Sequence, residues 1–276
     1  MPAQLSESAK EVQETIEGAS NGAKAVMAGN FLLAIVLSAS LNQLLALINT
    51  QQLIVMMPLF TATLPANAGM FFAKMMEIAA FELFDTKPYL DKYLGLAPSE
   101  PLNSNFEAVG FESVYVLHNM GTLVLAFFYY LFLVMFSYLL KCTTNYKVTH
   151  FREKLQRKLF WSSFIKLMFE SYSISTVSCL INLRFLSWDA WNTGMMSTLA
   201  LLMTSFLLLF IVFIGTYTSQ NFDALPFRSV KSKYGTIYSD LNLRNGKSVL
   251  LQPVWFLVRR FILAMIVVFL RTTVIW

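Results

Sequence analysis

Long, nearly uninterrupted apolar stretches are the feature that most constrains this chain. Several windows approach or exceed the roughly 20 apolar residues that an α-helix needs to cross about 30 Å of hydrocarbon. Of the 276 residues, 56% are hydrophobic and 13% are charged, against roughly 25% charged residues in ordinary soluble domains. No ten-residue alternating pattern typical of a transmembrane barrel is seen in the sequence. The sequence therefore predicts an all-α fold, a polytopic transmembrane helix bundle.

We predict about five spans after a polar N-terminal segment, residues 1–28, and we treat residues 29–276 as one transmembrane helical domain. The spans lie at about 31–54, 114–140, 161–183, 192–217 and 253–275. The third is the least apolar, and by itself it also fits an amphipathic helix lying in the membrane interface.

The charges of the loops favour a full membrane crossing for residues 161–183. Residues 141–158 carry six basic side chains and one acidic, and residues 218–252 carry five basic and two acidic. The positive-inside rule places both loops in the cytoplasm, so two crossings must separate them. Residues 61–111, with three basic and six acidic side chains, suit the outer side. We therefore expect a multi-pass protein of the plasma membrane with a cytoplasmic N-terminus.

The tryptophans support these boundaries. Each lies within a few residues of a predicted span end, where interfacial tryptophan is enriched; they are Trp161, Trp188, Trp191, Trp255 and Trp276. Two further segments are predicted to be interfacial amphipathic helices, residues 65–84 on the outer side and the basic run at 147–161 on the cytoplasmic side. The expected partners are the lipid bilayer, with anionic lipids at the basic cytoplasmic loops.

Motifs for catalysis or cofactor binding are missing from the sequence. It has no HExxH, GxSxG or P-loop, and no dinucleotide-binding glycine motif. Cys142 and Cys179 form no CxxC pair, and His150 is expected to be an ordinary interfacial cation. A helix-end bond to a neighbouring carbonyl is the simplest role for His118, with a ligand or proton relay as alternatives. We expect no enzymatic activity, no metal, no cofactor and no nucleic-acid partner.

Four ionisable residues fall inside predicted spans, where charges usually pair or line water. Lys166 and Glu170 are four residues apart in the third span, and Arg259 and Arg260 are adjacent in the fifth. Both sets lie in the cytoplasmic half. We predict that Glu170 pairs with Arg259 or Arg260 to hold the helices together; snorkelling to lipid headgroups and a gating role are the alternatives.

A polar stripe marks the first predicted span. At 100° per residue, four side chains fall in a sector about 80° wide: Ser38, Asn42, Asn49 and Gln52. Unpaired amides facing lipid are costly, so the stripe is expected to face other helices or water. It runs toward the outer side, near the level of His118 and Asn119. Interhelical packing and a water-filled vestibule both fit it.

Several motifs resemble a known family of membrane proteins. The segments are "GNFLLAIVLSASLNQLLALINTQQLIVMMPLF", "PANAGMFF", "FESVYVLHNMGTL", "FIKLMFESYSISTVSCLINL" and "KYGTIYSDLNLRNGKSVLLQPVWFLVRRFILAMIVVFL". They look like the membrane region of transient-receptor-potential-like (TRP-like) multi-spanning proteins of ciliate-type protists. The KYGxxY element followed by a double-arginine helix is also similar to fungal TRP-like proteins. The resemblance covers nearly all of the chain from Gly29 onward.

The resemblance implies a TRP-like cation-channel subunit or a channel-derived membrane module. Such proteins usually carry a large Cys-rich ectodomain upstream and further spans after the double-arginine helix, so we interpret the chain as a fragment or a reduced paralogue. The alternative is a non-conducting anchor, a lipid-interacting scaffold or a subunit of a larger membrane complex, and a homo-oligomer is compatible with either function. A carrier ranks third, because no internal repeat is evident.

Overall fold

The computed structural model describes residues 87–96, 99–120, 122–142, 164–238 and 246–270, with isolated residues 14, 15, 18, 59, 146, 149, 150, 152, 241 and 243. Every regular element in these ranges is a helix, which confirms the all-α prediction for the described part of the chain. The first predicted span, residues 31–54, and its stripe of Ser38, Asn42, Asn49 and Gln52 lie outside the described residues, as do nearly all of the two predicted interfacial segments.

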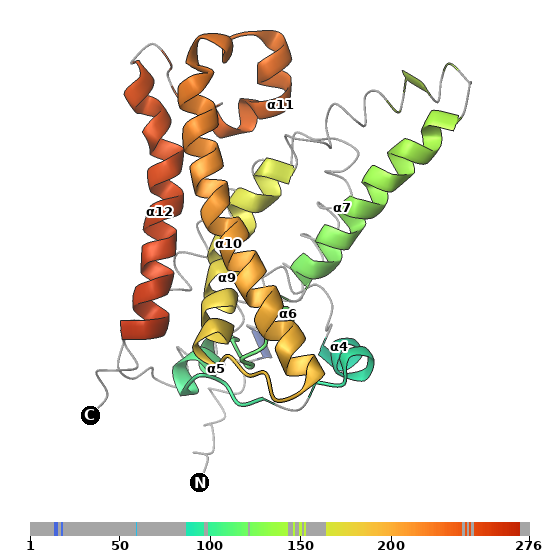
Figure 1. Cartoon of the computed structure of the whole chain (residues 1–276), viewed down its shortest axis with the longest axis vertical. Helices are drawn as coiled ribbons and strands as arrows, with labels where there is room; N and C mark the ends of the chain where they lie inside the picture. Colours follow the sequence, from blue (N-terminus) through green and yellow to red (C-terminus); the bar gives the residue numbers. More distant parts are fainter. Residues whose placement is uncertain are drawn as a thin grey trace.

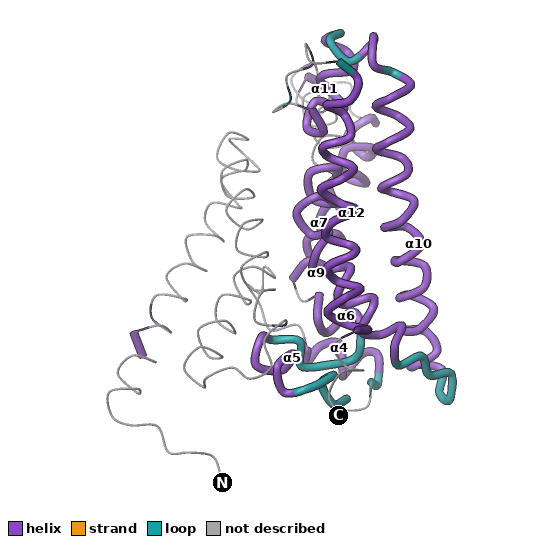
Figure 2. Tube along the Cα trace, turned by 90° about the vertical axis from the view of Figure 1, so that its left-hand side faces the viewer, coloured by secondary structure: helices purple, strands orange, loops and turns teal. Residues whose placement is uncertain are grey.

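Three helices run along the long axis of the molecule (Figure 1, Figure 2). They are α9 (Phe164–Arg184), α10 (Trp191–Gln220) and α12 (Leu251–Met265), the last continued by the π-helical turn η7 (Ile266–Leu270). Figure 1 shows α9 and α12 running in one direction and α10 in the opposite one. Alternating directions are what successive membrane crossings require.

Helix α9 is the centre of the bundle, in contact with α10, α12 and the short helix α6 (Val116–Met120). All of its residues from 171 to 182 are buried. A core of apolar side chains surrounds it, contributed by α6, α9, α10 and α12; it includes Val116, Ile174, Val177, Leu207, Ile214 and Leu257. A helix that is polar in composition is therefore enclosed by helices that are apolar.

Among the residues that the structure describes, two helices are long and apolar enough to cross a membrane: α10, and the stretch Lys247–Leu270 that contains η6 (Lys247–Leu250), α12 and η7. They match the fourth and fifth predicted spans. Only 28% and 33% of their apolar windows are buried, so most of their apolar side chains point outward. The core helix of a soluble protein would be mostly buried, since exposed apolar surface of this extent favours aggregation in water.

The second and third predicted spans are not among these two helices. Residues 114–140 contain α6 and α7 (Thr122–Leu139), and α7 leans away from α10 in Figure 1. Helix α9 matches residues 161–183 closely in length and is rich in serine. The five-span arrangement thus remains a prediction, with two spans matched by length and composition.

Short helices close the two ends of the bundle. At one end lie α4 (Lys87–Leu94) and α5 (Ser104–Val109), and at the other lie η4 (Phe222–Ala224) and α11 (Arg228–Tyr238) (Figure 1). Our sequence interpretation treated the segments of α5 and α11 as loops. For α5 the local signal is clear: the Asn103 side chain accepts the N–H groups of Asn105 and Phe106, and Gly110 ends the helix in the left-handed conformation.

Candidate functional site

The four predicted intramembrane charges lie on the neighbouring helices α9 and α12. Arg260 is 4% exposed; its Nη1 donates to the carbonyl oxygen of Phe169 at 3.3 Å, and its Cζ lies 4.3 Å from the centroid of the Phe256 ring. Arg259, by contrast, is exposed. The structure thus brings Arg260 to the turn of α9 that carries Glu170. The side chain of Glu170 is outside the described set, so its ion pair stays a prediction.

A second arginine links the same two helices at their other ends. Arg184, the last residue of α9, donates from Nη1 to the carbonyl oxygen of Val268 at 2.6 Å. Val268 lies in the π-helical turn η7, and π-helical turns shift the backbone bonding pattern and leave carbonyls available to side chains. Our sequence interpretation missed Arg184, although an arginine at the end of a predicted span is itself a signal.

The buried polar face of α9 is the largest feature that sequence reasoning missed. At 100° per residue, Ser171, Ser175, Ser178 and Asn182 fall in a sector about 60° wide; all four are buried. Serine and threonine hydroxyls often bond to their own helix backbone, as Thr176 does to the carbonyl of Tyr172 at 2.6 Å. Three buried atoms of α9 have no hydrogen-bond partner in the structure: Tyr172 Oη, Ser178 Oγ and Asn182 Oδ1.

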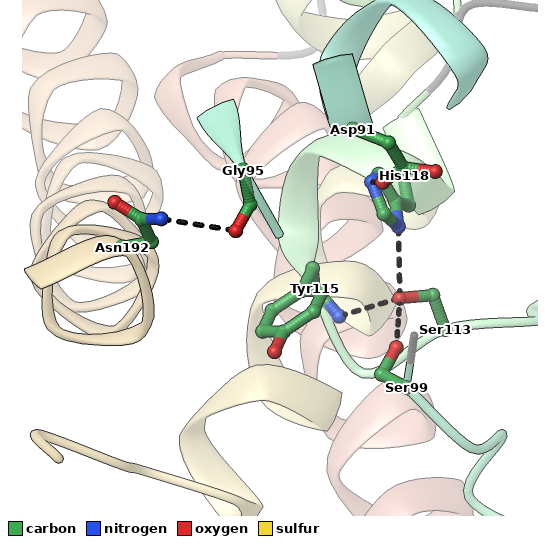
Figure 3. A network of polar contacts seen from close by, with 7 residues as sticks. All are labelled: Asp91, Gly95, Ser99, Ser113, Tyr115, His118 and Asn192. Carbon is green, nitrogen blue, oxygen red and sulfur yellow. Dashed lines mark hydrogen bonds and ion pairs between the residues drawn. The ribbon is translucent and has the colours of Figure 1, made fainter. Parts of the chain in front are cut away.

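At the end of the bundle near α4, His118 belongs to a polar network (Figure 3), and the neighbouring Asn119 bonds to the carbonyl of Ser113. Ser113 Oγ is its centre: it lies 3.1 Å from His118 Nδ1 and 2.6 Å from Ser99 Oγ, and it accepts the N–H of Tyr115 at 3.1 Å. His118 Nε2 lies 3.0 Å from Asp91 Oδ1. That distance suits an ion pair when the ring is protonated, although the angle at the ring nitrogen is outside the hydrogen-bond range.

In space, the ring of His118 lies between the carboxylate of Asp91 and the hydroxyl of Ser113. The histidine of an acyl-transfer triad likewise lies between a carboxylate and a hydroxyl. Its surroundings favour another role. Ser113 is 5% exposed, and its hydroxyl accepts a backbone N–H just before α6, as a helix-capping serine does. A hydroxyl held by Ser99, His118 and a backbone N–H has little freedom to attack a substrate. We therefore interpret the network as the connection between the surface helix α4 and α6.

Two asparagine amides hold the segment just before α6, one from α6 itself and one from α9. Asn119 Nδ2 donates to the carbonyl of Ser113 at 2.6 Å, and Asn182 Nδ2, from α9, donates to the next carbonyl, that of Val114, at 3.0 Å. Both residues are at least 96% buried, and neither Oδ1 has a hydrogen-bond partner. Sequence reasoning placed Asn119 at this level but did not find Asn182.

A third amide joins α4 to α10. Asn192 Nδ2 donates to the carbonyl of Gly95 at 3.0 Å (Figure 3). Gly95 follows α4 with φ of +58°, and a Cβ at that position would lie 3.1 Å from Asn192 Nδ2. Glycine is therefore needed here for both the backbone conformation and the close approach.

Within the described residues, no group of three or more His, Cys, Asp or Glu side chains is placed to hold a metal ion. The polar groups that the structure gathers are neutral oxygens and amides inside the bundle, two arginines bonded to carbonyls, and the Asp91–His118 contact at its end. No protein-family model, no curated protein and no solved structure matches the chain.

Proposed function

We propose that the chain is a multi-pass membrane protein that acts as a TRP-like cation-channel subunit or a channel-derived membrane module. The observation that carries this proposal is the position of α9, a serine-rich helix buried at the centre of an apolar bundle with three partnerless oxygen atoms. In a bilayer such atoms are costly unless water or an ion reaches them. Hydroxyl and amide oxygens are the groups that cation pathways use.

The membrane setting itself rests on the outward faces of α10 and α12. Leu202, Leu209 and Val212 of α10, and Ile262 and Leu270 of the α12–η7 stretch, are exposed apolar side chains. Lipid chains are the solvent that such faces suit. We further propose the plasma membrane as the location, a cytoplasmic N-terminus, anionic lipids at the basic loops 141–158 and 218–252, and a homo-oligomer or larger complex.

A non-conducting anchor, scaffold or complex subunit is the second candidate. Several polar groups of the bundle are satisfied by interhelical bonds, above all Arg184 to Val268, Arg260 to Phe169 and Asn182 to Val114. A bond between neutral groups, such as that of Asn182, contributes about 0.6–2 kcal/mol in membranes. Neither this bond nor the two arginine bonds needs a transport role to explain it.

Current recording separates the two candidates. The full chain, reconstituted into planar bilayers and recorded under several ionic gradients, is expected to carry cation-selective current. Ser178→Ala and Asn182→Leu should change its amplitude or selectivity. Thr198→Val, on the exposed side of α10, is the matched control and should not. Silence in a preparation that retains its helical circular dichroism spectrum and a cooperative thermal transition would favour the anchor.

A further inference from the structure

Two of the partnerless buried oxygens belong to amides that are anchored to neighbouring residues of the chain. Asn119 and Asn182 belong to different helices, but their Nδ2 atoms donate to the carbonyls of two consecutive residues, Ser113 and Val114. Because consecutive Cα atoms are only 3.8 Å apart, these anchors hold the two amides at the same level of the fold. Each amide has spent a donor on its anchor, so its remaining polar atom is an acceptor, Oδ1, without a partner.

A third oxygen extends this pair along α9. Ser178 is one helical turn before Asn182 on the same face, about 6 Å lower along the axis. Its side chain is 0% exposed, and its Oγ likewise has no partner. The three residues thus supply two amide oxygens and one hydroxyl oxygen in a region where α6 packs against α9.

The charges nearby suit a cation rather than an anion. Arg184 follows Asn182 by two residues, but it points about 160° away around α9 and bonds to Val268 on α12. On the other side, His118 precedes Asn119 and contacts the half-exposed carboxylate of Asp91. Exposed Glu107 and Glu112 lie in the same segment of chain, between α4 and α6. Acidic side chains outnumber basic ones by four to two in residues 87–113, and an excess of negative charge raises the local concentration of cations.

Neutral oxygens select the class of cation. Protein sites for Ca²⁺ and Mg²⁺ usually include carboxylate ligands, whereas uncharged carbonyl oxygens alone are enough for K⁺. We propose that α6 and α9 bind a dehydrated alkali-metal cation through Asn119 Oδ1, Asn182 Oδ1 and Ser178 Oγ. The site rests on the membrane setting of the proposed function but not on conduction, because a bound cation also stabilises a bundle that does not conduct.

Thermal stability in the presence of different salts tests the site. The full chain, purified in detergent, is unfolded in NaCl or KCl and in choline chloride at equal ionic strength, with tryptophan fluorescence as the readout. Na⁺ or K⁺ is expected to raise the Tm saturably, by about 5–10 °C at a hundredfold excess over Kd. Ser178→Ala, which keeps both amide anchors, should raise the half-saturating concentration about tenfold, as expected for the loss of about 1.4 kcal/mol.

Matched variants locate the ion. Asn182→Leu should abolish the salt-specific rise, whereas Asn192→Leu, which removes an interhelical amide outside the site, should keep it. Equal Tm in choline, Na⁺ and K⁺ for the wild type would mean that water alone meets these oxygens, and the proposal would be overturned. An unchanged rise in both Ser178→Ala and Asn182→Leu would also overturn it. If Na⁺ or K⁺ raises the Tm but the reconstituted chain carries no current, the cation site is supported and only the channel function is rejected.

Discussion

Arg184 donates from Nη1 to the carbonyl oxygen of Val268 at 2.6 Å and thereby joins the end of α9 to the π-helical turn of α12. At the other end of α9 the direction reverses, because Arg260 of α12 donates to the carbonyl of Phe169. Two arginine–carbonyl bonds of opposite direction therefore clamp these parallel helices. Hydrogen bonds from a charged donor are stronger than those between neutral groups, so both should be measurable in stability.

Arg184→Gln should lower the free energy of unfolding by about 1.5–3 kcal/mol, the usual contribution of a hydrogen bond to a charged group. The glutamine side chain is shorter than that of arginine, so it reaches the carbonyl of Val268 less well, and it carries no charge. Thermal unfolding in detergent measures the loss. Arg259→Gln makes the same chemical change at an exposed position of α12 and should have little effect. Equal losses in the two variants would contradict the clamp.

The predicted ion pair of Glu170 should involve Arg260 rather than Arg259. Arg260 is the buried arginine that reaches the carbonyl of Phe169, the residue before Glu170. Glu170→Arg and Arg260→Glu are each expected to reduce expression of folded protein, because each leaves a like-charge or unpaired contact inside the bundle. The double variant Glu170→Arg with Arg260→Glu should recover it.

The double variant Glu170→Arg with Arg259→Glu should not recover the yield of folded protein, since the side chain of Arg259 is exposed. Folded yield by size-exclusion chromatography is the measurement. Recovery with neither partner would remove the ion pair.

Gly95→Ala should cost about 1–2 kcal/mol, because an L-residue is strained at the left-handed φ of +58°. The new methyl group would also approach Asn192 Nδ2 to 3.1 Å and weaken its bond to the Gly95 carbonyl. Gly194→Ala is the control: it lies within α10, its Cβ would meet Trp188 at an ordinary 3.5 Å, and alanine favours a helix. The Tm should fall for the first variant and not for the second.

Tyr238 should make stability fall at high pH. Burial raises the pKa of its phenol above the ordinary value of about 10, and the Oη donates to the buried carbonyl of Leu225 at 2.7 Å. Because the folded pKa is higher than the unfolded one, this contribution is complete below about pH 10 and is lost as pH rises through the folded pKa.

Tyr238→Phe should remove this dependence and lower stability at neutral pH by about 0.5–1.5 kcal/mol. Unfolding by denaturant between pH 8 and 11 measures both effects. The exposed Tyr93→Phe should retain the wild-type profile. A wild-type slope above pH 10 in Tyr238→Phe would show that other groups cause it.

Features that depend only on residues close together in the chain were predictable from the sequence. Apolar windows predicted the helices at α10 and α12, since length and composition alone decide whether a segment suits hydrocarbon. Asn103 and Gly110 also carry local cap signals for α5, but our sequence interpretation did not use them. His118 and Asn119 were placed near one end of the bundle from their position in a span.

Contacts between distant residues required the fold. Arg259 and Arg260 are equivalent in a sequence, but they point about 100° apart on a helix, and only the packing of α12 against α9 buries one of them. Asp91, Ser99 and Ser113 meet near His118 because α4 and the loop after it fold back onto α6 (Figure 3).

The sequence by itself determined that this chain is helical and that its polar groups are too few to form its outer surface. Tertiary structure alone decided that the serine-rich α9 lies at the centre and that Asn119 and Asn182 face adjoining carbonyls. The physical reason is that hydropathy is a sum over neighbours in the chain. The partner of a buried polar group is instead set by which helix faces pack together.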